Sequence, residues 1–187
     1  MDIQNAILQR RTIRRFTQEP ISSEMLTGLV SLARLYASGG NLQPIRFVGI
    51  IEEGLRDRIF SVLRWAAYLP GFEISQENRP TAYLVLTCAG KHKNACKFDL
   101  GAAATTLMLA AEGEGIATCC LGAFDRDALS SVLSLSEDAE PLLVIAMGYP
   151  DQKSRVVSYT GDVKYFEDDN GTLCVPKLST EQVLKIF

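Results

Sequence analysis

Apolar residues recur at the helical period in several stretches of the chain. The clearest follows Ser22 and Ser23, where apolar side chains are spaced three or four positions apart, at Leu26, Leu29, Val30, Ala33 and Tyr36. Similar spacing predicts helices over residues 52–65 and 125–133, the second capped by Asp125. We also expect a short helix capped by Asp2 and a last one opened by a capping box at residues 179–182.

Short, nearly continuous apolar runs predict strands at residues 46–51, 83–88, 117–121 and 142–147. Because these runs are apolar at successive positions, both faces of the strands must be covered. Interspersed strands and helices of this kind indicate an α+β fold, a central mixed β-sheet flanked by helices. The 187 residues suffice for one domain, residues 1–187, with residues 156–187 as a C-terminal extension that packs on the domain or on a partner.

Residues 99–111 predict a helix of an unusual kind. Its first two turns carry small side chains nearly all round, with little bulk or charge on any face. A helix of this composition is buried on several sides. It therefore serves either as the spine of the domain or as a surface that packs closely against a second copy.

The connection over residues 66–80 has no clear periodicity and contains several Pro and Gly residues. Connections of this length are often lids or binding loops. Three aromatic residues lie in or beside it, Trp65, Tyr68 and Phe72. They either line a substrate pocket or pack into the core, and the sequence does not distinguish the two.

Charge and hydropathy narrow the class of protein. The formal net charge is −3, which argues against a broad nucleic-acid surface. No apolar run reaches the roughly 18 residues of a membrane helix. The first residues lack the basic and apolar regions of a secretion signal, so we expect a cytoplasmic protein that binds neither nucleic acid nor membrane.

The cysteine pattern predicts free thiols. There are five, an odd number, without a Cys-x-x-Cys pair and with His92 as the one histidine. This fits neither a disulfide framework nor a zinc site, so we expect buried free thiols and no metal. His92 lies among lysines in a polar turn at residues 91–94 and is expected to be solvated.

Residues 9–16 contain four arginines within six positions, Arg10, Arg11, Arg14 and Arg15. Two unit charges 4 Å apart repel by about 4 kcal/mol at an effective dielectric near 20. Only Asp2 and Glu19 lie nearby in sequence to neutralise them. The cluster is therefore either a helix end whose arginines point into water or a site for an anion, and a phosphate suits the guanidinium fork best.

Four motifs together resemble the nitroreductase family of FMN enzymes. They are residues 10–16 (RRTIRRF), 38–44 (SGGNLQP), 115–124 (GIATCCLGAF) and 148–150 (GYP). They occur in the order and at the spacing of that family, and the similarity covers nearly the whole chain. The resemblance implies a nitroreductase-like fold and a domain-sharing homodimer with two FMN molecules at the subunit interface.

The resemblance also assigns cofactor contacts by position. Arg10, Arg11, Thr12 and Arg14 would hold the phosphate, ribityl chain and pyrimidine edge of FMN. From the other subunit, Ser38, Gly39, Asn41 and Gln43 would lie along the ring. The segment Leu121, Gly122 and Ala123 would direct backbone N–H groups at flavin N5 and O4, while Lys153 and Arg155 would close over the phosphate.

The implied activity is that of an FMN-dependent oxidoreductase. NADH or NADPH would pass hydride to flavin N5 and leave, and a nitroaromatic, quinone or similar small acceptor would then be reduced in a ping-pong mechanism. Arg14 would be the catalytic residue, because it places positive charge where reduced flavin becomes anionic. The motifs specify neither the preferred nicotinamide nor the physiological acceptor.

Alternatives remain at this point. Gly39, Gly40, Ile45 and Cys120 depart from residues frequent in the family. One alternative is therefore a family member with different flavin chemistry, such as dehalogenation, flavin fragmentation or sensing. Another is a non-enzymatic module whose arginines bind nucleic acid or a phosphorylated partner. The adjacent Cys119 and Cys120 are either redox-active beside the flavin or ordinary buried strand residues.

Overall fold

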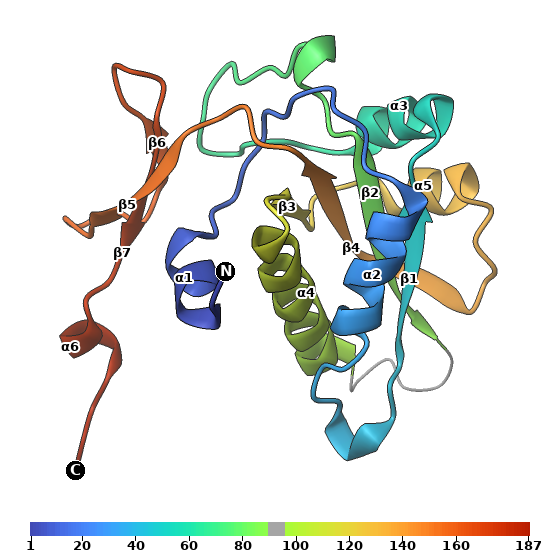
Figure 1. Ribbon diagram of the computed structural model, residues 1–187, viewed down its shortest axis with the longest axis horizontal. Coiled ribbons are helices and arrows are strands. Elements are labelled where there is room, and N and C mark those ends of the chain that lie inside the picture. The colour runs from blue at the N-terminus through green and yellow to red at the C-terminus, as the bar shows by residue number, and fades with distance from the viewer. Residues whose placement is uncertain (90–95) are drawn as a thin grey trace.

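A four-stranded antiparallel sheet forms the centre of the computed structural model, which describes residues 1–89 and 96–187 (Figure 1). Its strands lie in the order β1-β2-β4-β3, and each neighbouring pair is antiparallel. Their bounds are Ile45–Ile50 for β1, Ala82–Ala89 for β2, Ala117–Leu121 for β3 and Ala139–Gly148 for β4. The four predicted strands are therefore all present.

Helices cover both faces of this sheet. One face packs against α2 (Ser23–Ala33) and α4 (Cys96–Gly113), and the other against α3 (Glu53–Val62) and α5 (Arg126–Val132). Successive residues of β2 alternate between the two cores, with Leu84 and Leu86 in the first and Tyr83 and Val85 in the second. This alternation explains why the strand reads as a continuous apolar run.

The predicted helix starts are confirmed by their caps. Asp2 accepts the N–H of Asn5, Ser22 that of Met25, and Asp125 that of Ala128. The helix predicted to reach residue 65 ends at Val62. It ends early because Leu63 pairs with Phe124 as a β-bridge and the Arg64 N–H donates to the Ala123 carbonyl at 3.0 Å.

A smaller sheet lies to one side, next to α1 (Ile3–Gln9) (Figure 1). Its strand order is β5-β7-β6, with β5 parallel and β6 antiparallel to β7. The bounds are Ser154–Ser158 for β5, Phe166–Glu167 for β6 and Leu173–Lys177 for β7. The α+β class is confirmed, and the mixed pairing expected of the central sheet is found in this smaller one.

Short helices complete the description. Two are 3₁₀ turns, η1 (Gly39–Asn41) and η2 (Gln76–Asn78). The last, α6 (Thr180–Val183), begins at Ser179, whose N–H donates to the Gln182 side chain at 2.9 Å, as the capping box predicts. Beyond it the C-terminal residues extend away from the domain (Figure 1), and Ile186 and Phe187 are exposed.

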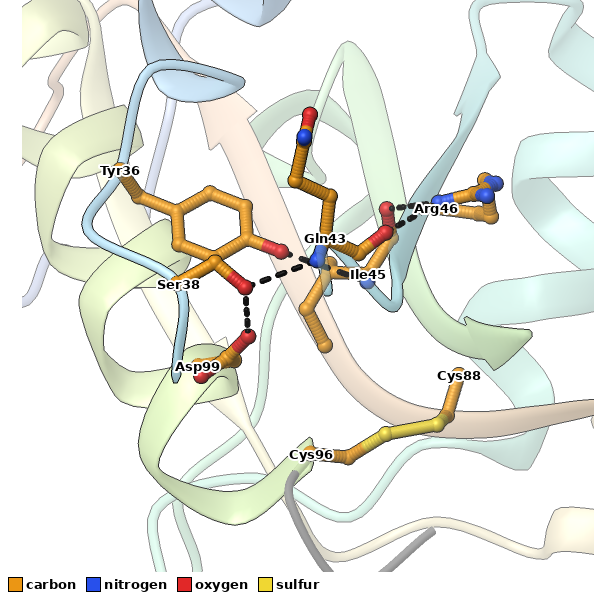
Figure 2. Close-up of a disulfide and its surroundings, with 8 residues drawn as sticks. All are labelled: Tyr36, Ser38, Gln43, Ile45, Arg46, Cys88, Cys96 and Asp99. Carbon is orange, nitrogen blue, oxygen red and sulfur yellow. Dashed lines mark hydrogen bonds between the residues drawn. A yellow bond between two sulfur atoms is a disulfide. The ribbon is translucent and has the colours of Figure 1, made fainter. Parts of the chain in front are cut away.

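The cysteine prediction was wrong for two of the five residues. Cys88, near the end of β2, and Cys96, the first residue of α4, form a disulfide with their Cα atoms 6.4 Å apart (Figure 2). The pair escapes motif analysis because the fold, not a short spacing, joins the two element ends. Cys119, Cys120 and Cys174 are free, as predicted. His92 and the turn at 91–94 lie outside the described residues.

Residues 1–89 and 96–187 contain neither a membrane-spanning helix nor a metal-binding cluster. None of their helices is long and apolar enough to cross a membrane. Within these same ranges, no three His, Cys, Asp or Glu side chains gather closely enough to hold a metal ion.

Candidate functional site

Residues 10–16, which we term the arginine segment, run in extended form beside β3. Thr12 pairs with Thr118 in a parallel bridge, and the Ile13 N–H donates to the Thr118 carbonyl at 3.1 Å. Further along, Phe16 pairs with Pro150 and is fully buried. The segment is therefore held in the domain, and α1 ends at Gln9, before the arginines begin.

Two of the four arginines are committed to structural contacts. Arg11 donates to the carbonyls of Leu8 and Arg10 and so caps the last turn of α1. Partial burial and the charge of Arg10 lower the pKa of this guanidinium. Arg15 forms an ion pair with Glu167 at 2.8 Å and lies over the ring of Phe72.

Arg14 is different, because it is buried without a hydrogen-bond partner for most of its guanidinium. The residue is only 8% exposed, and neither Nε nor Nη1 has a partner among the described residues. Its backbone N–H donates to Gln152 Oε1 at 2.9 Å, which fixes the position of the chain. One face of the guanidinium is covered by Tyr165, whose ring centroid lies 4.5 Å from the guanidinium carbon.

A buried charge with unpaired donors destabilises a fold unless a ligand completes it. Nε and Nη1 of Arg14 are both N–H donors of a charged group, so each suits an acceptor with negative or carbonyl oxygen atoms. FMN carries both, in its phosphate and in the carbonyls of its pyrimidine edge. The residues present therefore fit this cofactor at Arg14.

A cavity of about 260 Å³ lies beside the arginine segment. Arg11 and Ile13 line it together with Glu112 of α4, Gln152 and Ser154. Burial raises the pKa of Glu112, an effect that the charges of Arg10 and Arg11 partly offset. The cavity is thus lined by one basic side chain, Arg11, and one acidic side chain, Glu112.

The end of β3 is open on one side. Leu121 is buried, whereas Gly122 and Ala123 are exposed, and a Cβ atom added at Gly122 would meet no atom within 4 Å.

The same strand, β3, carries Cys119 and Cys120. Burial raises the pKa of these thiols to about 12 and about 11, so both stay protonated at neutral pH. Because the thiolate is the reactive form, the structure favours a packing role for them.

The basic pair after β4 is only partly directed to the arginine segment. Gln152, next to Lys153, bonds to Arg14, and Lys153 itself is exposed. Arg155 is exposed and pairs with Asp168 at 3.2 Å. Its assignment to a phosphate therefore stays a prediction.

The second predicted group of cofactor residues is built on Asp99, a buried residue of α4. The Ser38 hydroxyl donates to Asp99 Oδ2 at 2.5 Å, and the Gly39 N–H donates to Oδ1 at 3.1 Å. The Gln43 N–H in turn donates to Ser38 Oγ at 2.8 Å (Figure 2). We call residues 38–43 the Asp99-anchored loop.

The loop has an unusual backbone that this network stabilises. Gly40, Asn41 and Gln43 have φ values of +57°, +56° and +48°, in the left-handed region that non-glycine residues seldom adopt. The Gln43 side chain points away from Asp99 (Figure 2), and its Nε2 donates to Asn41 Oδ1 at 3.1 Å. The loop thus presents amide groups outward.

Within one chain the two groups lie at opposite ends of α4 (Figure 1). The Asp99-anchored loop contacts the start of this helix, whereas Glu112, near its end, lines the cavity beside the arginine segment. Asp99 and Glu112 are 13 residues apart in α4. At 1.5 Å per residue the separation is about 20 Å. A single chain does not bring all the predicted cofactor residues together.

Of the three aromatic residues in or beside the 66–80 region, Trp65 takes the expected packing role. Trp65 packs in the core beside Phe60, with ring centroids 5.5 Å apart. Tyr68 is half-exposed and lies against Tyr165, while Phe72 lies under Arg15.

The sequence analysis missed three residues that shape the site, Asp99, Gln152 and Tyr165. Asp99 was visible only as the polar start of a helix, and Gln152 only as a neighbour of Lys153. No local signal identified Tyr165, which reaches Arg14 from 151 positions away in the chain.

Comparison with known proteins places the chain in a family. The family model described as the nitroreductase family matches residues 7–67 and 79–149. A protein of Archaeoglobus fulgidus, provisionally named an NADH dehydrogenase/NAD(P)H nitroreductase, is 26% identical over 157 residues. That match covers 79% of this chain and 85% of the relative.

Solved structures agree in fold. A Parabacteroides distasonis protein with the same provisional name superposes with a TM-score of 0.71 at 22% identity, covering 89% of this chain and 97% of the other. The FMN and NADPH-dependent nitroreductase NfnB of Sphigopyxis sp. strain HMH gives a TM-score of 0.66 at 19% identity, with coverage of 81% and 89%. By the extent of the family match and the shared fold, this chain belongs to the nitroreductase family.

Proposed function

We propose that the protein is an FMN-dependent enzyme that oxidises NADH or NADPH and reduces a small acceptor, such as a nitroaromatic or a quinone, by a ping-pong mechanism. The observation that carries the proposal is the buried Arg14 guanidinium with Nε and Nη1 unpaired. Oxidoreductase activity with a flavin and NAD(P)H agrees with the family and with the name of NfnB. Cytoplasmic location stays a prediction from the sequence.

When bound, FMN would supply the two-electron chemistry between nicotinamide and acceptor. The chain's own part is to bind and orient it. Arg14 would donate to the pyrimidine edge, which favours negative charge there. Arg10 and Thr12 would hold the phosphate end, and the exposed backbone at Gly122 and Ala123 would lie along the reactive edge.

The complete site would need a second copy. The loop and the arginine segment are about 20 Å apart along α4, and two α4 helices packed antiparallel would bring the loop of one chain to the arginine segment of the other. The face of α4 that carries Phe98, Gly101 and Thr105 is exposed, with Phe98 88% exposed. Exposed apolar residues on α1 and on the C-terminal residues, including Ile7 and Phe187, would also be covered in such a homodimer.

The structural contacts of Arg11 and Arg15 argue against the alternative that the arginine cluster binds nucleic acid. Arg11 caps a helix and Arg15 is paired, so the cluster does not present four free charges to a polyanion. The other flavin chemistries within the family are the second candidate function, and a panel of acceptors distinguishes it from the first.

The test starts with colour and stoichiometry. Purified protein should be a yellow dimer that releases one FMN per chain on denaturation. Anaerobic mixing with NADH or NADPH should bleach the flavin, and a panel of nitroaromatics and quinones should restore its colour. Colourless protein that takes up no FMN would overturn the proposal, whereas bleaching without restoration by any acceptor in the panel would favour the other flavin chemistries.

A further inference from the structure

Two tyrosines from distant parts of the chain lie beside Arg14: Tyr165 contacts the guanidinium, and Tyr68 contacts Tyr165. The Tyr165 ring, from the connection between β5 and β6, lies 4.5 Å from the guanidinium carbon. The Tyr68 ring, from the connection after α3, lies 5.1 Å from the Tyr165 ring at an interplanar angle of 56°. We call Tyr68 and Tyr165 the aromatic cover.

The aromatic cover uses none of the N–H donors of Arg14. The N–H groups of a guanidinium lie in its plane, so a ring on its face uses none of them. Tyr165 therefore restricts the plane of the group, and Nε and Nη1 stay unpaired. The side chain is buried and oriented before any acceptor arrives.

The aromatic cover is itself fixed in place. Glu167, two residues after Tyr165, accepts from Arg15 at 2.8 Å and from Gln152 Nε2 at 3.3 Å. Behind it, Tyr68 lies within a tight turn in which the Leu69 N–H donates to the Ala66 carbonyl at 2.8 Å. Contacts on both sides thus hold the Tyr165 ring against Arg14.

We propose that Tyr165 is a positioning residue for the flavin: it holds the Arg14 guanidinium in the plane from which this group donates to the cofactor. The inference rests on the proposed function, since FMN is the hydrogen-bond acceptor that we propose for Arg14. The hydroxyl of Tyr165 plays no part in it, and the ring face alone matters. Removing the ring would cost the preorganisation that a fixed donor provides.

The experiment compares Y165F and Y165L, with F166L as the matched control. Phe166 is the next residue, aromatic and half-exposed, and has no contact with Arg14 among the ring contacts of the described residues. Flavin-free protein is titrated with FMN by fluorescence quenching, and the midpoint potential of the bound flavin is measured. Thermal unfolding of each flavin-free variant reports its folding.

We expect Y165F and F166L to bind FMN as the wild type does. Y165L should bind it roughly 3- to 30-fold more weakly, the range of a partly to fully desolvated cation–π contact. Its midpoint potential should become more negative, because a less well-placed positive charge favours the reduced, more negative flavin less. A merely structural role would lower the unfolding temperature without moving the potential.

The outcomes separate the two proposals. If wild-type protein binds no FMN, the proposed function fails and this inference with it. If the wild type binds FMN and Y165L matches it in affinity and potential, only this inference fails. Should Y165L not fold, Y68L tests the same contact from the outer ring: weaker FMN binding than in F166L supports the inference, and equal binding overturns it.

Discussion

The arginine segment and the Asp99-anchored loop lie at the two ends of α4 and are completed in opposite ways. At the loop, Asp99 accepts the hydroxyl of Ser38 and the N–H of Gly39, so the buried carboxylate is paired within the chain. At the arginine segment, Arg14 is also buried, but two of its donors have no partner among the described residues. One buried charge is thus paired within the fold and the other is not, which is why we propose cofactor binding at Arg14.

Replacing Arg14 should give the largest effect and separate binding from stability. R14M keeps the apolar stem and removes the donors, so FMN affinity should fall about 10- to 100-fold, the range of a charge-assisted hydrogen bond. The flavin-free protein should be no less stable, because an unpaired buried charge is removed. FMN titration and thermal unfolding measure the two quantities. R58M, at an exposed position of α3, is the control, and equal FMN binding by both variants would contradict the assignment.

Reducing the Cys88–Cys96 disulfide should act on the loop end alone. Closing a chain segment this short stabilises a protein by about 2–3 kcal/mol, so reductant should lower the free energy of unfolding by that amount. Hydrogen exchange should quicken in the Asp99-anchored loop, because Cys96 begins the helix turn that carries Asp99, and stay unchanged in the arginine segment. Urea unfolding with and without reductant checks the first point.

A thiol count is the matching control for that experiment. The unfolded protein should titrate three thiols without reductant and five with it, and C88A/C96A should be insensitive to reductant. Five thiols in unreduced protein would show that the bond is absent.

Removing Asp99 should cost about 1–3 kcal/mol, because the Ser38 hydroxyl and the Gly39 N–H lose their buried acceptor. For a chain of this length, the unfolding temperature should fall by several degrees. S38A, which leaves the carboxylate in place with the Gly39 N–H, should lose less. Thermal unfolding of D99A, S38A and wild type decides the order. Equal unfolding temperatures for D99A and wild type would mean that the loop does not depend on Asp99.

The smallest expected effect is a pH dependence of protein stability that comes from Cys119, in the strand beside the arginine segment. Burial raises the pKa of Cys119 from 9.0 to about 12 in the folded protein, so the unfolded chain loses this proton first. The contribution of this thiol to the free energy of unfolding is complete below pH 9 and is lost as the pH rises toward 12. Denaturant midpoints at pH 8 and pH 10.5 should therefore differ more in wild type than in C119A. Tyr83, whose pKa burial also raises, contributes the same background to both.

Local sequence signals predicted the elements well because their causes are local. Asp2, Ser22 and Asp125 cap the helices they were expected to cap, since a cap bonds to an N–H three residues on. The two-faced burial of β2 follows directly from its apolar run. The end of α3 was misplaced because a bridge to Phe124, far along the chain, decides it.

The candidate site could be proposed from the sequence, but the different roles of its arginines could not. Four arginines within six positions are chemically alike, and nothing nearby in sequence separates Arg14 from Arg15. Their different roles come from Gln152, Tyr165 and Glu167, all more than 130 positions away. The Cys88–Cys96 bond spans only 8 positions and escaped prediction for another reason, because it depends on how the end of β2 meets the start of α4.

The contacts of the arginine segment also govern when the site can exist during synthesis. Phe16 pairs with Pro150, and Arg15 with Glu167, so the arginine segment is made well before its partners. Until about residue 167 has emerged from the ribosome, the segment lacks these contacts. Because contacts between distant parts of a chain form late, a nascent chain stalled before that point would carry its arginines in solution, incapable of retaining a cofactor.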